Sequence, residues 1–169
     1  MVVAETMVAQ HIAFGVIAAI VIGGALLVVT TNNVVRAALY LVAVLAGVGA
    51  SFLLLGAEFV GITQILVYIG AIVVLFLFGI MLTRAPIGRE LQLTGRNWPV
   101  GIVVGLALAG VLGYSLIDAF GSDKLPAGSH QLTADVSDSI FSTYLVPFEV
   151  VSVLLLAALV GAIVLARKE

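Results

Sequence analysis

The sequence contains no cysteine among its 169 residues, and only 9% of its residues are charged. Without cysteine the chain can supply neither a disulfide, nor an iron–sulfur ligand, nor a thiol nucleophile. A soluble globular domain carries about 25% charged residues, so this low charge excludes an ordinary soluble domain. The seven basic residues form no cluster with stacking aromatic residues, which excludes the usual pattern of a nucleic-acid-binding surface.

The sequence also lacks the residue groups that form an active site. Its two histidines, His11 and His130, are far apart and do not have metal-ligand spacing. There is no Ser/His/Asp constellation, no phosphate-binding GxxxxGK[ST] motif and no dinucleotide fingerprint. We therefore expect no catalytic residue, no metal site and no cofactor site in this chain alone. A transport-type role and membrane scaffolding are the two remaining classes.

Apolar residues dominate what is present: 63% of the chain is hydrophobic, and the mean hydropathy is +1.30. They form five runs of about twenty or more residues, a length that suits transmembrane α-helices and not the ten-residue alternating strands of a barrel. The sequence predicts an all-α polytopic membrane protein, with residues 1–169 forming a single membrane domain. No basic residue precedes the first run, so we interpret it as a retained span and not as a secretory signal. The predicted spans are approximately residues 11–30, 34–56, 59–82, 99–120 and 147–166.

The basic residues predict the orientation of these spans. With the N-terminus outside, six of the seven basic residues fall on the cytoplasmic side, which is a clear positive-inside asymmetry. These six are Arg36, Arg84, Arg89, Arg96, Arg167 and Lys168, whereas Lys124 alone falls outside. We therefore expect an outside N-terminus and a cytoplasmic C-terminus.

The run from Phe59 to Leu82 is the stretch around which the chain is organised. At about 1.5 Å per residue it covers roughly 36 Å, enough to cross a hydrocarbon core of roughly 30 Å. Gln64 and Tyr68 are polar and four residues apart, so they share a helix face. These two side chains either join packed helices by hydrogen bonds or line a hydrated proton or water path, and the sequence leaves both interpretations open.

The centre of the same run has a weak preference for regular α-helix. Glycine and β-branched residues both lower helix preference, and they follow one another here. Close helix packing is one explanation; a π-bulge, a form that is enriched at functional sites, is the other. The candidate residues for such a bulge are Tyr68, Gly70, Ala71, Ile72, Val73 and Val74.

Glu149 is the other polar residue near a predicted span, and it follows Pro147. A carboxylate in a first helical turn is favoured by the helix dipole, and proline is favoured at the first helical position. If the helix instead starts near Ile140, Glu149 lies deeper, where ionisable residues usually mark a pathway. Outside the spans, we expect a tight polar turn at residues 31–33 and a short interfacial helix at residues 135–143.

Three segments resemble one known family. The run EFVGITQILVYIGAIVVLFLFGIML, with VYIGAIVVLF at its centre, is similar to the third helix of the subunit J family of proton-pumping NADH–quinone oxidoreductases (respiratory complex I). That family includes the equivalent chain of the photosynthetic NDH complex. The segments YLVPFEVVSVLLLAALVGAIVLARK and NNVVRAALYLV resemble the last helix and the start of the second helix of the same family.

This resemblance implies a non-catalytic core subunit of the membrane arm. In the family, a π-bulge in the third helix can revert to α-helix, and this change is linked to a water path between the quinone cavity and the antiporter-like subunits. The implied gating residues are Tyr68 to Val74, with Gly70 and Ala71 as the flexible part. Gln64 stands where some members have Glu, which argues against an obligatory carboxylate there. Glu149 matches a family carboxylate.

The resemblance also implies what surrounds the chain. FMN, iron–sulfur clusters and a quinone belong to the whole complex, and the partners are the quinone-site subunit and the small neighbours of the antiporter-like chains. The expected location is the bacterial inner membrane or a thylakoid-type membrane. The alternatives are a subunit that only completes packing and assembly, and a stand-alone small transporter, which would need an acid deep in a span.

Overall fold

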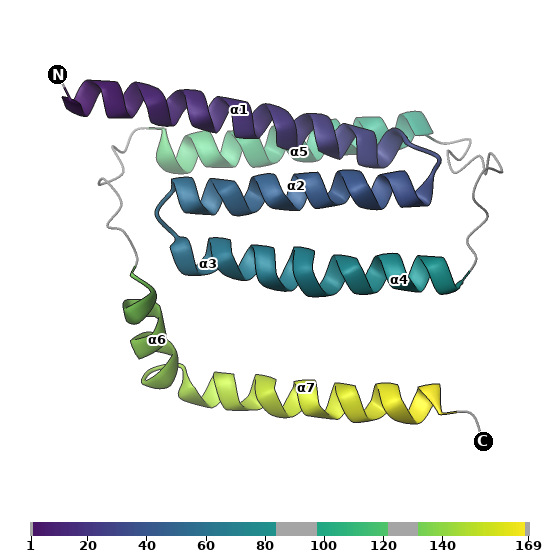
Figure 1. The fold of residues 1–169 in the computed structure, drawn as a ribbon. Helices are drawn as coiled ribbons and strands as arrows, with labels where there is room; N and C mark the ends of the chain where they lie inside the picture. Colours follow the sequence, from purple (N-terminus) through teal and green to yellow (C-terminus); the bar gives the residue numbers. More distant parts are fainter. Residues whose placement is uncertain (1, 84–97, 122–131, 168–169) are drawn as a thin grey trace. The chain divides into compact units, whose positions relative to one another are not determined.

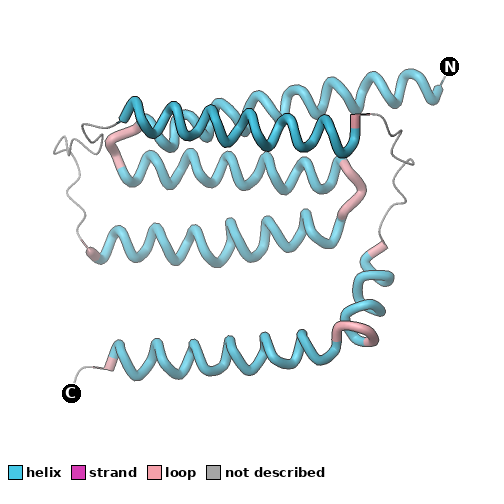
Figure 2. Tube along the Cα trace, turned by 180° about the vertical axis from the view of Figure 1, so that it is seen from behind, coloured by secondary structure: helices cyan, strands magenta, loops and turns pink. Residues whose placement is uncertain are grey.

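The computed structural model describes residues 2–83, 98–121 and 132–167, and it consists of helices joined by short turns (Figure 1). Figure 2 shows helix and loop but no strand in this described part. Five helical segments are long and apolar enough to cross a membrane, which confirms the predicted all-α, five-span fold. They are Val8–Thr30, Val34–Leu54, Glu58–Leu82, Trp98–Phe120 and Leu145–Ala166.

The first two helices form a hairpin, α1 (Val2–Thr30) and α2 (Val34–Leu54). The predicted polar turn joins them: Asn33 is the N-cap of α2, and its Oδ1 accepts a hydrogen bond from the backbone N–H of Arg36 at 3.1 Å. Glycines allow the two helices to approach closely. A Cβ added at Gly24 would lie 2.8 Å from Cγ2 of Val44, and one added at Gly47 would collide with Cγ2 of Val21.

The third span follows α2 after a three-residue turn and comprises α3 (Glu58–Thr63), η1 (Gln64–Val73) and α4 (Val74–Leu82). Gly56 sets this turn with φ of 77°, a left-handed conformation that ends α2 two residues before the predicted boundary. The Ala57 N–H donates to the carbonyl of Phe52 at 2.9 Å. The chain therefore reverses direction, and α2 packs between α1 and the third span (Figure 1).

The fourth predicted span is α5 (Trp98–Phe120), which begins one residue before the predicted start at residue 99 and buries no residue. Arg84, Arg89 and Arg96, which were predicted on the cytoplasmic side, lie in residues 84–97, outside the described residues.

The segment Gln131–Glu169 forms a second compact unit, separate from Met1–His130. It contains α6 (Thr133–Phe141), close to the expected interfacial helix, and α7 (Leu145–Ala166). The two helices meet at an edge-to-face aromatic pair, Phe141 and Phe148, with ring centroids 5.4 Å apart. Helix α7 starts two residues before Pro147. This start is possible because a first helical turn tolerates proline.

Candidate functional site

The third span is not regularly wound: its middle ten residues, η1, form a π-helix. Such winding is rare and mostly limited to single turns. Half of η1 is β-branched, and Gly70 adds another poor helix former, so regular α winding has little intrinsic advantage here. The β-branched residues are Ile65, Val67, Ile69, Ile72 and Val73.

The position of this π-helix differs from the predicted bulge at both ends. It starts at Gln64, four residues before Tyr68, and it stops at Val73, so that Val74 is the first residue of α4. β-branched residues occur on both sides of this start, at Ile62, Thr63 and Ile65, so they do not mark where the π-helix begins. Gly70, Ala71 and Ile72 all lie inside η1.

The π winding decides which side chains of η1 face α2. Gln64 and Val73 are its two buried residues, with 8% and 2% of their surfaces exposed. They are nine residues apart, and at about 100° per residue a regular α-helix would put them on opposite faces. A winding closed by i→i+5 bonds takes between four and five residues per turn, so nine residues make about two turns. The π-helix therefore places both residues on the same face.

Gln64 lies against Gly49 of α2. A Cβ added at Gly49 of α2 would stand 3.5 Å from Cγ of Gln64. Among the described residues, no side-chain nitrogen or oxygen is both fully enclosed and without a hydrogen-bond partner. No hydrogen bond of the Gln64 amide is found within this part of the chain. The amide therefore reaches the edge of the packed helices, where a water molecule or another chain can meet it.

Tyr68 and Gly70 lie on the open side of η1. Tyr68 is 48% exposed, so its hydroxyl is available to a neighbour outside this chain. Beyond the nearest turn of its own helix, the atom closest to a Cβ added at Gly70 would be the carbonyl oxygen of Ile65, five residues back, at an ordinary contact distance of 3.5 Å. Ala71 and Ile72 are exposed as well. Within the described chain, space for a turn to rotate is present around Gly70.

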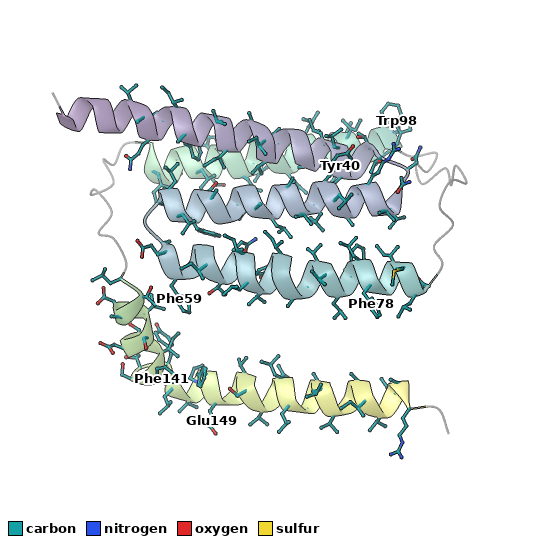
Figure 3. All side chains as sticks on the ribbon, viewed as in Figure 1. Tyr40, Phe59, Phe78, Trp98, Phe141 and Glu149 are labelled. Carbon is teal, nitrogen blue, oxygen red and sulfur yellow. The ribbon has the colours of Figure 1, made fainter. Side chains whose placement is uncertain are left out.

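Glu149 belongs to the second unit, so it is described apart from the third span. It is the fifth residue of α7, roughly 6 Å along the axis from Leu145. This position matches neither alternative considered from the sequence: α7 starts before Pro147, and Ile140 lies in α6. Figure 3 shows the Glu149 side chain projecting from α7, and it is exposed.

The packing partners of the third span on α2 were not predicted. Gly61 of α3 lies against Gly49 and Leu53: an added Cβ would stand 3.1 Å from the carbonyl oxygen of Gly49 and 2.9 Å from Cγ of Leu53. Glycines indicated close packing in general, but no pattern in the sequence paired these two positions.

Comparison with known proteins gives consistent matches. The chain matches the family described as NADH-ubiquinone/plastoquinone oxidoreductase chain 6 over residues 24–165. It is 39% identical over 168 residues to NAD(P)H-quinone oxidoreductase chain 6 of Leptolyngbya boryana, covering 95% of this chain and 81% of the relative. It is 38% identical over 165 residues to F(420)H(2) dehydrogenase subunit J of Methanosarcina mazei, covering 92% of this chain and 90% of the relative. The corresponding protein of Synechocystis sp. is 38% identical over 166 residues, with 95% and 82% covered.

Proposed function

This chain belongs to the NADH-ubiquinone/plastoquinone oxidoreductase chain 6 family, and from that premise we propose that its third span gates the proton path of a membrane-bound quinone oxidoreductase. The chain is a multi-pass membrane subunit of that enzyme complex. With no cysteine and no motif for a redox cofactor, its own contribution is mechanical and electrostatic. The single observation that supports gating is the π-helix at Gln64–Val73.

The gate is a change of winding in η1. If the segment tightens to regular α-helix, Val73 turns by about half a turn relative to Gln64, because nine residues at about 100° each end on the opposite face. Tyr68 lies between Gln64 and Val73, so it rotates about the helix axis by a smaller angle than Val73. A hydroxyl at the middle of a membrane must find a hydrogen-bond partner, so turning Tyr68 changes which neighbour or water it can meet. The two windings are the two states of the gate.

The polar groups have separate roles in this proposal. Gln64 and Tyr68 orient water along the path, because neither an amide nor a neutral hydroxyl needs to change charge to do so. Glu149 is a carboxylate one turn inside α7, and it accepts and releases protons there. The residues whose winding changes are Tyr68, Gly70, Ala71, Ile72 and Val73. The part of the helix that turns as a result begins at Val74.

The surroundings of the chain are part of the proposal. FMN, iron–sulfur clusters and quinone are held by other subunits, and the neighbours are the quinone-site subunit and small membrane-arm subunits. The N-terminus lies outside and the C-terminus in the cytoplasm, as the basic residues indicate. The relatives come from cyanobacteria and an archaeon, so either a plasma membrane or a thylakoid-type membrane is the location.

A Gly70→Leu variant tests the gate. Leucine prefers α-helix over glycine by about 0.8 kcal/mol, and its side chain must pass any neighbouring helix when the turn rotates. We expect a several-fold loss of protons pumped per quinone reduced, measured with a pH-sensitive dye in vesicles that contain the assembled complex. Electron transfer from the donor to ferricyanide should be unchanged.

The matched control is Gly79→Leu in α4, because it adds the same side chain to a segment that is already α-helical, where no atom lies within 4 Å of a Cβ added at Gly79. It should pump normally. Wild-type stoichiometry in an assembled Gly70→Leu complex would count against gating by this segment.

Tyr68→Phe separates the polar role of this residue from its packing role, since it removes a hydroxyl with little change in volume. A hydrogen bond contributes about 1 kcal/mol, so we expect proton pumping to slow about fivefold while assembly is retained. The initial rate of dye response in vesicles measures this effect. An unchanged rate would favour the alternative role, in which the chain only completes packing and assembly.

A further inference from the structure

We propose that the last two turns of α5 form a docking site for a basic side chain, best an arginine, on a transmembrane helix of a neighbouring subunit. The site consists of Tyr114, Ser115 and Asp118. It concerns how this chain is held in its complex, so it goes beyond the gate and does not depend on a change of winding in η1.

Helix α5 is a span without a packing partner in its own chain. It buries no residue, and no other described helix packs against it. Its 23 residues cover roughly 34 Å against a hydrocarbon core of roughly 30 Å, so only about one residue at each end lies outside the core. Apolar side chains on such a helix can face lipid, whereas polar groups on it need hydrogen-bond partners.

The hydroxyl of Ser115 is available to a neighbour. A serine on a helix can satisfy its hydroxyl by donating to the carbonyl four residues back. Ser51 in α2 donates in this way to Gly47 at 3.0 Å. Ser152 in α7 donates in the same way to Phe148 at 2.9 Å. Ser115 makes no such bond within the described chain and is exposed, although it lies roughly 7 Å before the end of α5.

Tyr114 and Asp118 lie beside Ser115 on the helix surface. Tyr114 is four residues before Asp118 and Ser115 is three residues before it, and residues at these spacings are neighbours on a helix. Tyr114 is 72% exposed, and Asp118 is exposed as well. Within the part of the chain that the structure describes, neither side chain has a hydrogen bond or an ion pair. The site therefore offers a carboxylate, two hydroxyls and an aromatic face, all of which attract a cationic donor.

The charge at this end of α5 favours a basic partner. Asp118 lies in the last helical turn, where the helix dipole is already negative and a basic residue is normally favoured, but α5 has no basic residue there. A guanidinium has five N–H donors, so it can meet the Asp118 carboxylate and the Ser115 hydroxyl together. The long apolar stem of an arginine can lie along a neighbouring helix at this depth. A lipid headgroup stays in the interfacial layer and does not reach Ser115.

Photo-crosslinking in the purified complex tests the site. With the photoreactive residue p-benzoylphenylalanine at position 114, illumination should link this chain to another subunit. Mass spectrometry should place the linked residue in a transmembrane helix, within one turn of an arginine or lysine. The same photoreactive residue at position 116, about 200° around the helix axis, is the control and should not reach that helix. A link only to lipid, only within this chain, or to a helix without a basic residue within one turn would overturn the proposal.

Asp118→Asn tests the charge, since it removes the carboxylate at nearly constant volume. We expect a several-fold loss of this chain from the complex after a wash in mild detergent, measured on a blue-native gel, whereas Asp118→Glu should be retained like wild type. Full retention of Asp118→Asn would contradict the proposal. If neither variant assembles, the cross-link from position 114 decides, because that chain keeps Asp118. Neither measurement uses proton pumping, so a failure here is distinct from a failure of the gate.

Discussion

Deleting Gly70 and Ala71 together should abolish quinone-coupled proton pumping in a complex that assembles and still reduces ferricyanide. In the natural chain Val73 is nine residues after Gln64, and after the deletion it is seven residues after Gln64. Seven residues at about 100° each give a rotation of roughly 700° about the helix axis, close to two full turns. A regular α-helix can then place both residues against α2, and the π-helix is no longer needed.

The shortened span still crosses the membrane. The third span has 25 residues, and the 23 that remain cover roughly 34 Å against a hydrocarbon core of roughly 30 Å. The deletion therefore keeps the packing faces and the length while removing the second winding state. The number of protons translocated per quinone, measured in vesicles, should fall to background.

The matched control deletes Gly79 and Ile80 from α4. It shortens the span equally but preserves η1, and α4 buries no residue that the deletion could displace. This control should pump. If the Gly70–Ala71 deletion pumps like its control, winding change in η1 is not part of coupling.

The sequence allowed the spans to be predicted because their signal is local. Each is a predominantly apolar run of about twenty or more residues, and such a run forms a helix in a bilayer whatever its neighbours are. Two boundaries moved where single residues act: the positive φ of Gly56 ended α2 early, and Pro147 was accommodated inside the first turn of α7. The first helix, α1, also begins before the predicted residue 11.

The start of the π-helix could not be predicted in the same way. β-branched residues and Gly70 show that α winding is weakly preferred, but they do not set the hydrogen-bond register. The register depends on which residues α2 covers, and Gln64 and Val73 are covered together only in the wider winding. The contact between α2 and the third span therefore determines where the π-helix starts.

Glycine pairing between spans has the same limit. Gly23 and Gly24 are adjacent in sequence and about 100° apart around the helix axis. Gly24 faces Val44, whereas nothing lies within 4 Å of a Cβ added at Gly23. The sequence marks both residues as permitting close approach, and only the rotation of α1 against α2 determines which one uses it.

Gly47→Val should prevent the subunit from accumulating in the complex. The added side chain would enter the space that Val21 of α1 already occupies, and Ile17 lies beside it. Overpacking of this kind destabilises by about 3 kcal/mol, roughly a hundredfold in the folded population. The measurement is the amount of this chain in the assembled complex on a blue-native gel, relative to wild type.

Two variants make this prediction specific to the α1–α2 contact. Gly23→Val adds the same volume to α1 where the described chain leaves space open, so it should accumulate normally. Val21→Gly combined with Gly47→Val exchanges the two side chains across the contact at constant volume, and it should restore most of the lost complex. If the exchange fails to rescue assembly while Gly23→Val assembles, the loss at Gly47 comes from a face other than α1, and the reciprocal packing of Val21 and Gly47 is not what holds the hairpin together.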